Sequence, residues 1–222
     1  MSVKPRPVPN IPPRSWSTWD RSVSTKLYHY VSRKVPRKYM MLLEHSGNGL
    51  VWLLGAACMC LYPHTTQQQR CAVANFLLAF VLDLILVGTL KSVFRRPRPI
   101  YNSSGDFILV VSVDQYSFPS GHASRAFYVA AFACVYLKQW SLWVCLLVVM
   151  WGFTTAASRA AMGRHYVGDV CAGIPLGLLT VAIVTQGHFS PDSMLLNAQH
   201  LQQCHEAVNK LWLRSATMGR II

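Results

Sequence analysis

Two residues four positions apart, His165 and Asp169, are the first candidates for chemistry in this 222-residue chain. If a helix begins near His165, the two side chains lie on one face, one turn apart. Asp169 could then accept the Nδ1 proton of the imidazole and leave the Nε2 lone pair free. A neutral imidazole oriented in this way serves as a general base or as a nucleophile. Arg159, just upstream, adds a guanidinium that can bind an anion through two parallel hydrogen bonds.

Two other polar segments stand at the ends of apolar runs. The first carries Lys91 and Arg98, and the second is the sequence Pro-Ser-Gly-His at residues 119–122. In chain order the three segments read K-x6-R-P, P-S-G-H and S-R-x5-H-x3-D. Cations, histidines and a carboxylate are groups from which a phosphoryl-transfer site can be built.

This pattern resembles the three-part signature of the type 2 phosphatidic acid phosphatase superfamily, which also contains the vanadium haloperoxidases. The resemblance covers about residues 48–186. It implies that His165 attacks phosphorus and forms a phosphohistidine, while Asp169 holds and polarises the ring. It also implies that His122 protonates the leaving oxygen and then activates water, a division of roles that suits groups titrating near neutrality.

The remaining site residues are predicted from the charge of the substrate. Fixed cations stabilise the equatorial oxygens of a phosphoryl group, and a helix start adds N–H donors and a favourable dipole end. We therefore expect phosphate to be bound by Lys91, Arg98, Ser120, Gly121 and Arg159. Three further arginines either contact a second phosphate or hold the lipid surface: Arg95, Arg96 and Arg164.

No metal and no cofactor are expected. A two-metal site needs clustered carboxylates. The loops on the catalytic side offer only Asp106, Asp114 and Asp169.

The composition indicates a membrane protein. Hydrophobic residues make up 52% of the chain and charged residues only 13%, where a soluble domain usually has about a quarter. The net charge is nevertheless +13. Cations outside the apolar runs favour anionic lipid or phosphate as partners, with no nucleic acid, although positive-inside topology alone explains most of the N-terminal ones.

The apolar runs predict an all-α, multi-span membrane helix bundle with about five transmembrane helices. The run at 50–61 is short for a hydrocarbon core of roughly 30 Å. Asp83, inside the second run, is expected to face the bundle interior, and Gly173 and Gly177 permit close helix packing. The runs are 50–61, 71–90, 123–137, 141–157 and 167–185.

Four regions are expected along the chain. Residues 1–14 form a disordered, basic, proline-rich tail, and residues 187–222 form a polar tail with helical periodicity. Residues 15–47 are an interfacial amphipathic helix and linker, with Asp20 in a capping box at the start of the helix. An ordinary surface helix packed on the domain is the alternative. The membrane phosphatase domain is residues 48–186, with a strand or re-entrant lid at 107–113.

Counting spans places the three motifs together. The first ends one span, the second begins the next, and the third joins the following two, while the turn at Lys138 lies on the other side. All three should therefore meet at one membrane surface. With nine Lys/Arg between Lys4 and Lys38, the positive-inside rule makes that surface cytosolic, if 50–61 spans.

The substrate is then a lipid phosphate whose tail lies in the bilayer. The short chain, the basic N-terminal extension and the Arg-Arg-Pro-Arg-Pro run at 95–99 resemble the subgroup that hydrolyses presqualene, farnesyl and geranylgeranyl diphosphates. That resemblance implies the endoplasmic reticulum, extending to the nuclear envelope, where polyisoprenoids are handled. It leaves the oligomeric state open.

Three alternatives remain at this point. Phosphatidate, lysophosphatidate or sphingosine 1-phosphate could be the substrate instead. A catalytically silent membrane scaffold is the alternative of another class, which the intact set of charged residues opposes. A vanadate-dependent peroxidase has a similar site, but those enzymes are usually soluble, and the apolar spans oppose it.

Overall fold

The computed structural model describes residues 18–62, 66–101, 115–136 and 142–187. Within those residues the chain is all-α, and Pro97 and Tyr116 form an isolated antiparallel bridge. The seven helices described are α1 (Thr18–Lys34), α2 (Arg37–Ser46), α3 (Gly49–Leu61), α4 (Gln67–Phe94), α5 (Gly121–Tyr136), α6 (Leu142–Ala161) and α7 (Val167–Gly187). Predictions for residues 1–14, for 107–113 with Asp106 and Asp114, and for 188–222 concern segments outside the described residues.

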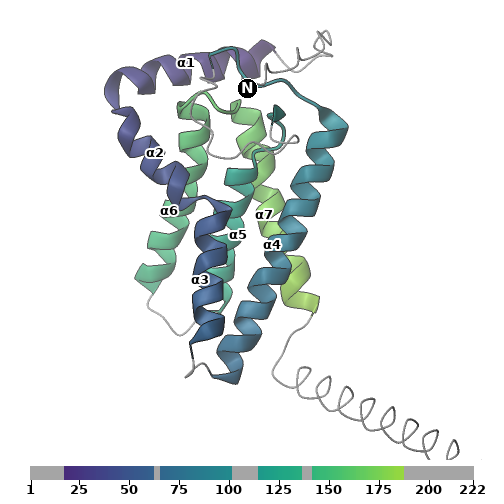
Figure 1. Ribbon diagram of the computed structural model, residues 1–222. Coiled ribbons are helices and arrows are strands. Elements are labelled where there is room, and N and C mark those ends of the chain that lie inside the picture. Colours follow the sequence, from purple (N-terminus) through teal and green to yellow (C-terminus); the bar gives the residue numbers. More distant parts are fainter. Residues whose placement is uncertain (1–17, 63–65, 102–114, 137–141, 188–222) are drawn as a thin grey trace, which may run out of the picture.

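Helices α3 to α7 stand side by side as a bundle, and α1 lies across one end of it (Figure 1). Helix α5 is the central element, since it packs on α4, α6 and α7. Helix α2 continues from α1 after Pro36, whose missing N–H and fixed φ suit a helix boundary. The predicted helix-and-linker of 15–47 is thus two helices, both packed against α6.

Local signals in the sequence fix the ends of the long helix α4. Thr66 and Gln69 form a complete capping box, with reciprocal side chain to backbone hydrogen bonds. The helix ends at Arg95, which adopts a left-handed conformation at φ 46°. This ending directs residues 95–99 away from the helix axis and across the end of the bundle.

An aromatic cluster forms the core in the middle of the bundle. Phe80, Tyr128 and Phe132 pack with Val181 and Val184 of α7. A second cluster lies nearer the α1 end and brings Leu27 of α1 against Phe127 and Ala156. Helix α1 is therefore packed on the bundle along this face.

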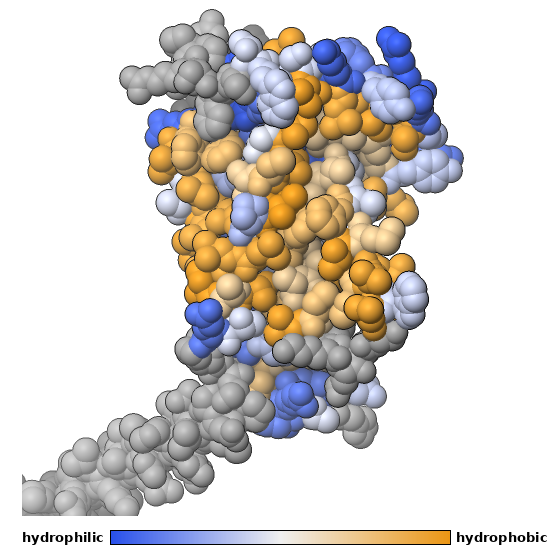
Figure 2. Space-filling view, turned by 180° about the vertical axis from the view of Figure 1, so that it is seen from behind, coloured by the Kyte–Doolittle hydropathy of each residue, from blue (hydrophilic) through white to orange (hydrophobic). Residues whose placement is uncertain are grey.

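Three described helices are long and apolar enough to cross a membrane: Gln67–Phe94, Leu142–Ala161 and Val167–Gln186. Helix α3 has 13 residues and α5 has 16, so both are shorter than a typical span. Side chains on the outside of the bundle form a broad apolar belt, with hydrophilic residues gathered at the two ends (Figure 2).

Asp83 faces the bundle interior, as predicted. Its side chain is fully buried and accepts a short hydrogen bond from the hydroxyl of Ser124, and Arg125 lies 3.6 Å away. A buried membrane carboxylate therefore ties α4 to the first turns of α5.

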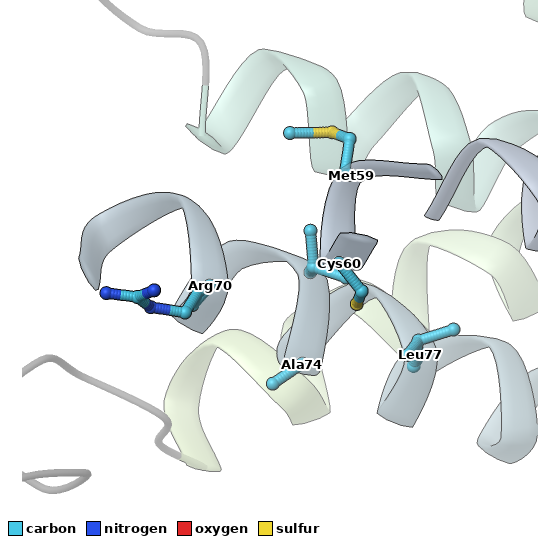
Figure 3. A pocket seen from close by; sticks show the side chains of 6 residues that line it. Met59, Cys60, Arg70, Ala74 and Leu77 are labelled. Carbon is cyan, nitrogen blue, oxygen red and sulfur yellow. The ribbon is translucent and has the colours of Figure 1, made fainter. Parts of the chain in front are cut away.

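A cavity of about 250 Å³ lies between α3 and the start of α4. It is lined by apolar side chains and Arg70 (Figure 3). Lys91 is at the other end of the same helix, 21 residues on, which corresponds to roughly 30 Å. The cavity is thus remote from the predicted site residues.

The close packing of α5 on α7 requires a residue without a side chain at Gly177. A Cβ at this position would lie 2.1 Å from the Ser124 carbonyl oxygen, whereas a Cβ at Gly55 of α3 meets nothing within 4 Å. We expect Gly177→Ala to lower the free energy of unfolding by about 1–3 kcal/mol, the usual cost of overpacking. Thermal unfolding in detergent measures this, with Gly55→Ala as the matched control. Equal stability of the two variants would contradict the close approach of α5 and α7.

Candidate active site

The structure brings the three predicted segments together at the α1 end of the bundle. The backbone N–H of Ser120 donates to the carbonyl of Asp169 at 3.0 Å. Arg98 donates to the carbonyl of Arg164 at 3.2 Å. Lys91 is buried in the last turn of α4, and its charge acts on His165. The predicted convergence of the motifs is confirmed.

Ser120 and Gly121 form the start of α5. The Ser120 hydroxyl accepts the Ala123 N–H at 3.4 Å, so Ser120 caps the helix. A Cβ on Gly121 would stand 3.3 Å from Val87 of α4, which is a tight contact. The helix N-terminus, with its partial positive charge, thus lies at the site.

A backbone carbonyl orients His165. The ring is 2% exposed, and its Nδ1 lies 2.7 Å from the Ser117 carbonyl oxygen. A carbonyl only accepts, so Nδ1 carries the proton and Nε2 the lone pair. The sequence predicts Asp169 as the Nδ1 acceptor, but its nearest oxygen is 3.7 Å away. The hydrogen-bond partner of the imidazole is thus the Ser117 carbonyl, and Asp169 is only a neighbour of the ring.

Asp169 is engaged at the start of α7. One oxygen accepts the Tyr166 N–H at 2.8 Å, and the other pairs with Arg96 at 2.7 Å. Asp169 therefore caps its own helix from the third position while its charge is matched by a buried guanidinium.

Arg96 is placed differently from either predicted role. It is 2% exposed and bridges Asp169 and Asp20, each at 2.7 Å. Its guanidinium lies 4.0 Å from the centre of the Tyr166 ring. These two carboxylates and the ring give the Arg96 guanidinium a structural role. We therefore do not assign Arg96 to a second phosphate or to the lipid surface.

Arg95 and Arg164, the other two arginines considered for a second phosphate, differ in burial. Arg95 is exposed and donates from Nε to the Ser92 carbonyl at 2.9 Å. Arg164 is fully buried, and its Nη2 lies 3.6 Å from Glu44 of α2. Arg159, also buried, pairs with the same Glu44 at 2.9 Å.

Sequence reasoning misses Glu44 and the structural role of Asp20. Both lie on the two N-terminal helices, which the sequence assigns to the membrane interface. Asp20 accepts the Gly168 N–H at 2.9 Å, so its carboxylate serves the start of α7. The available signal is that Asp20 and Glu44 are the only two carboxylates among the first 47 residues, which are rich in cations.

His122 lies at the second position of α5 and close to the other charged site groups. Its ring interacts electrostatically with Arg159, Arg125, His165 and Lys91. The link between α2 and α3 lies against it, since a Cβ at Gly47 would be 3.5 Å from the His122 ring. The two histidines thus lie in one cationic site, in which His165 is buried and His122 is partly exposed.

The environment of His165 favours the neutral imidazole. Burial, together with the charges of Arg98, Arg159 and Lys91, holds the pKa of His165 well below its ordinary value of 6.5. The hydrogen bond to Ser117 acts in the opposite direction but is the smaller effect. At neutral pH the Nε2 lone pair is therefore available as a nucleophile.

Comparison with known proteins identifies the family of this chain. The PAP2 superfamily profile matches residues 72–191. A probable lipid phosphate phosphatase beta of Arabidopsis thaliana is 35% identical over 184 residues, covering 72% of this chain and 84% of that protein. An undecaprenyl-diphosphatase of Sulfolobus acidocaldarius is 27% identical over 177 residues, 78% of this chain and 82% of that protein.

A solved structure has the same fold. The transmembrane PAP2-type phosphatidylglycerolphosphate phosphatase of Bacillus subtilis superimposes with a TM-score of 0.60 at 24% identity, covering 78% of this chain and 87% of that one. A bundle with apolar spans and a cationic, histidine-bearing end defines an integral membrane phosphohydrolase. The chain belongs to the PAP2 superfamily, within its lipid phosphatases.

Removing the charge of Glu44 should destabilise the site. Glu44→Gln leaves Arg159 and Arg164 without their shared carboxylate, and breaking one partner of a buried pair costs about 3 kcal/mol. We expect a lower unfolding temperature in detergent. In a double-mutant cycle with Arg159→Gln, the cost of losing Glu44 should shrink. Strictly additive effects would show that the Glu44–Arg159 pair carries no coupling.

The lowered pKa of His165 gives stability a pH dependence. Below pH 6.5 the unfolded chain binds a proton at this residue that the folded chain does not bind. The free energy of unfolding should therefore fall as the pH drops below about 6.5, by up to about 1.4 kcal/mol per pH unit from this group, until the folded pKa is reached. Unfolding curves from about pH 5 to 8 should be flatter for His165→Gln. Identical slopes in both proteins would rule out the contribution.

Proposed function

We propose that this chain hydrolyses lipid phosphates through a phosphohistidine on His165. The observation that carries the proposal is the contact of Nδ1 with the Ser117 carbonyl at 2.7 Å. It fixes the tautomer and leaves Nε2 unprotonated, in a buried site with three cations. A buried, neutral imidazole beside fixed positive charge suits attack on an anionic phosphorus centre.

The first step transfers the phosphoryl group to His165. The Nε2 lone pair forms a bond to phosphorus while the bond from phosphorus to the leaving oxygen breaks, and His122 gives that oxygen its proton. Lys91, Arg98 and Arg159 hold the equatorial oxygens, together with the N–H donors at the start of α5.

The second step releases phosphate. Neutral His122 takes a proton from water, and the resulting hydroxide oxygen bonds to phosphorus as the P–N bond breaks. Inorganic phosphate leaves, His165 returns to the neutral state and His122 is protonated again. No residue in this cycle requires a metal. Among the residues with described positions, no group of three or more histidine, cysteine or acidic side chains is arranged to hold one.

Polyisoprenoid diphosphates are our proposed substrates, namely presqualene, farnesyl and geranylgeranyl diphosphate and their monophosphates. A relative named undecaprenyl-diphosphatase supports this class, as does the Arg-Arg-Pro-Arg-Pro run at residues 95–99. The relative named lipid phosphate phosphatase favours the second candidate class, namely phosphatidate, lysophosphatidate and sphingosine 1-phosphate.

We further propose that α3 and α5 complete a five-span bundle, with α1 at the membrane interface. Trp19 and Tyr30 on α1 are 67% and 60% exposed, which suits aromatic anchors at the headgroup level. With the cations of α1 at the same end of the bundle as the site, the positive-inside rule favours a cytosolic catalytic face. The substrate class favours the endoplasmic reticulum and nuclear envelope.

Purified protein should release phosphate from farnesyl diphosphate faster than from phosphatidic acid, with and without EDTA. His165→Ala should abolish release, by at least about 10³-fold, because the nucleophile is lost. His45→Ala, an exposed histidine on α2, is the matched control. Turnover that survives His165→Ala would refute the mechanism, and loss of turnover in EDTA would refute metal independence. A preference for phosphatidic acid would favour the second substrate class, and a folded protein without activity on any lipid phosphate would favour the scaffold.

A further inference from the structure

The N-terminal helix supplies a carboxylate to the interior of the site region. Asp20 lies in the first turn of α1 and is 7% exposed, although the rest of that helix is rich in exposed cations. Its two oxygens have different partners: one pairs with Arg96 at 2.7 Å, and the other accepts the Gly168 N–H at 2.9 Å. A buried carboxylate satisfied on both oxygens is fixed in place.

Helix α1 also provides caps for α7. The first N–H groups of a helix have no partner inside the helix and must be satisfied elsewhere. Here Val167 donates to the Ser24 hydroxyl at 2.9 Å, one turn along α1 from Asp20. The start of α7, two residues after His165, is thus held by two side chains of α1.

Gly168 reflects the close approach of Asp20. A Cβ on this residue would lie 2.9 Å from an Asp20 carboxylate oxygen and 3.2 Å from its Cγ. Any larger residue would displace the carboxylate. A glycine at this position is therefore required by α1, independently of the phosphate-binding residues.

Arg96 links Asp20 to the nucleophile. Its Nη2 binds Asp20 and its Nη1 binds Asp169, which lies 3.7 Å from the His165 ring. Loss of the Asp20 charge leaves the buried guanidinium with one carboxylate instead of two. Any resulting shift of Arg96 would act on Asp169, which lies next to the imidazole.

We propose that Asp20 is a positioning residue of the phosphatase reaction, which acts through Arg96 and the first turn of α7 to hold Asp169 and the His165 ring in the attacking orientation. This inference rests on the proposed role of His165 as the nucleophile. It assigns the N-terminal helix to the active site as well as to the membrane surface.

The test compares two ways of disturbing Asp20 in the full-length protein, in detergent with farnesyl diphosphate as the probe. Asp20→Asn keeps an acceptor for Gly168 but removes the charge that Arg96 binds. Gly168→Ala keeps the charge but pushes the carboxylate away. We expect each to lower kcat by about tenfold to hundredfold, the range typical for outer partners that orient a functional histidine, with KM changed less than about twofold. Ser22→Ala, exposed on the same helix, is the control.

A double variant separates positioning from simple packing. Asp20→Ala removes the group that an alanine at 168 would meet, so Asp20→Ala with Gly168→Ala should be no slower than Asp20→Ala alone. Rapid-quench measurement of phosphoenzyme gives the active fraction and the rate of His165 phosphorylation. The proposal requires that rate, per active site, to fall.

Each alternative result has a defined meaning. Wild-type phosphorylation rates in both Asp20→Asn and Gly168→Ala, with His165→Ala inactive, would overturn the positioning role and leave the proposed function intact. A smaller active fraction with an unchanged rate would also overturn it, since Asp20 would then serve folding alone. Full activity of His165→Ala would remove the proposed function itself. If Asp20→Ala does not fold, Gly168→Ala decides, because it retains every charge.

Discussion

One buried guanidinium holds the site region together. Arg96, in the segment that follows α4, lies between a carboxylate of α1 and a carboxylate of α7, each at 2.7 Å, and over the Tyr166 ring. Buried charges are tolerated only when paired and hydrogen-bonded. Arg96 therefore couples the end of α4 to the start of α7 and to α1. A shift of any of these elements would separate a buried charge from its partner.

The same principle explains why a site for an anion contains so many acids. Lys91, Arg98 and Arg159 repel one another, and bringing them together without substrate is unfavourable. Glu44 offsets this cost for Arg159 and Arg164, while Asp20 and Asp169 offset it for Arg96. Burial, together with the remaining positive charge around His165, still lowers the pKa of the imidazole and favours its neutral form.

The sequence alone predicts the bundle, the convergence of the three motifs and the inward direction of Asp83. These follow from the apolar runs and from their order along the chain, which can be read directly. It cannot distinguish Arg96 from Arg98. Both lie in one basic run, and only the structure shows that Arg96 turns inward to two carboxylates. Nor can it find the Ser117 carbonyl as the partner of His165, since every residue has a carbonyl. Asp20 and Glu44 are missed because their partners are far away in the chain.

The contact between α1 and α7 also sets an order of assembly. The Asp20 carboxylate and the Gly168 N–H are separated by 148 positions in the chain. During synthesis α1 leaves the ribosome long before α7. Asp20 therefore lacks its Gly168 partner until α7 has been made. This contact at the site end of the bundle can therefore form only after the polypeptide between the two helices has been synthesised.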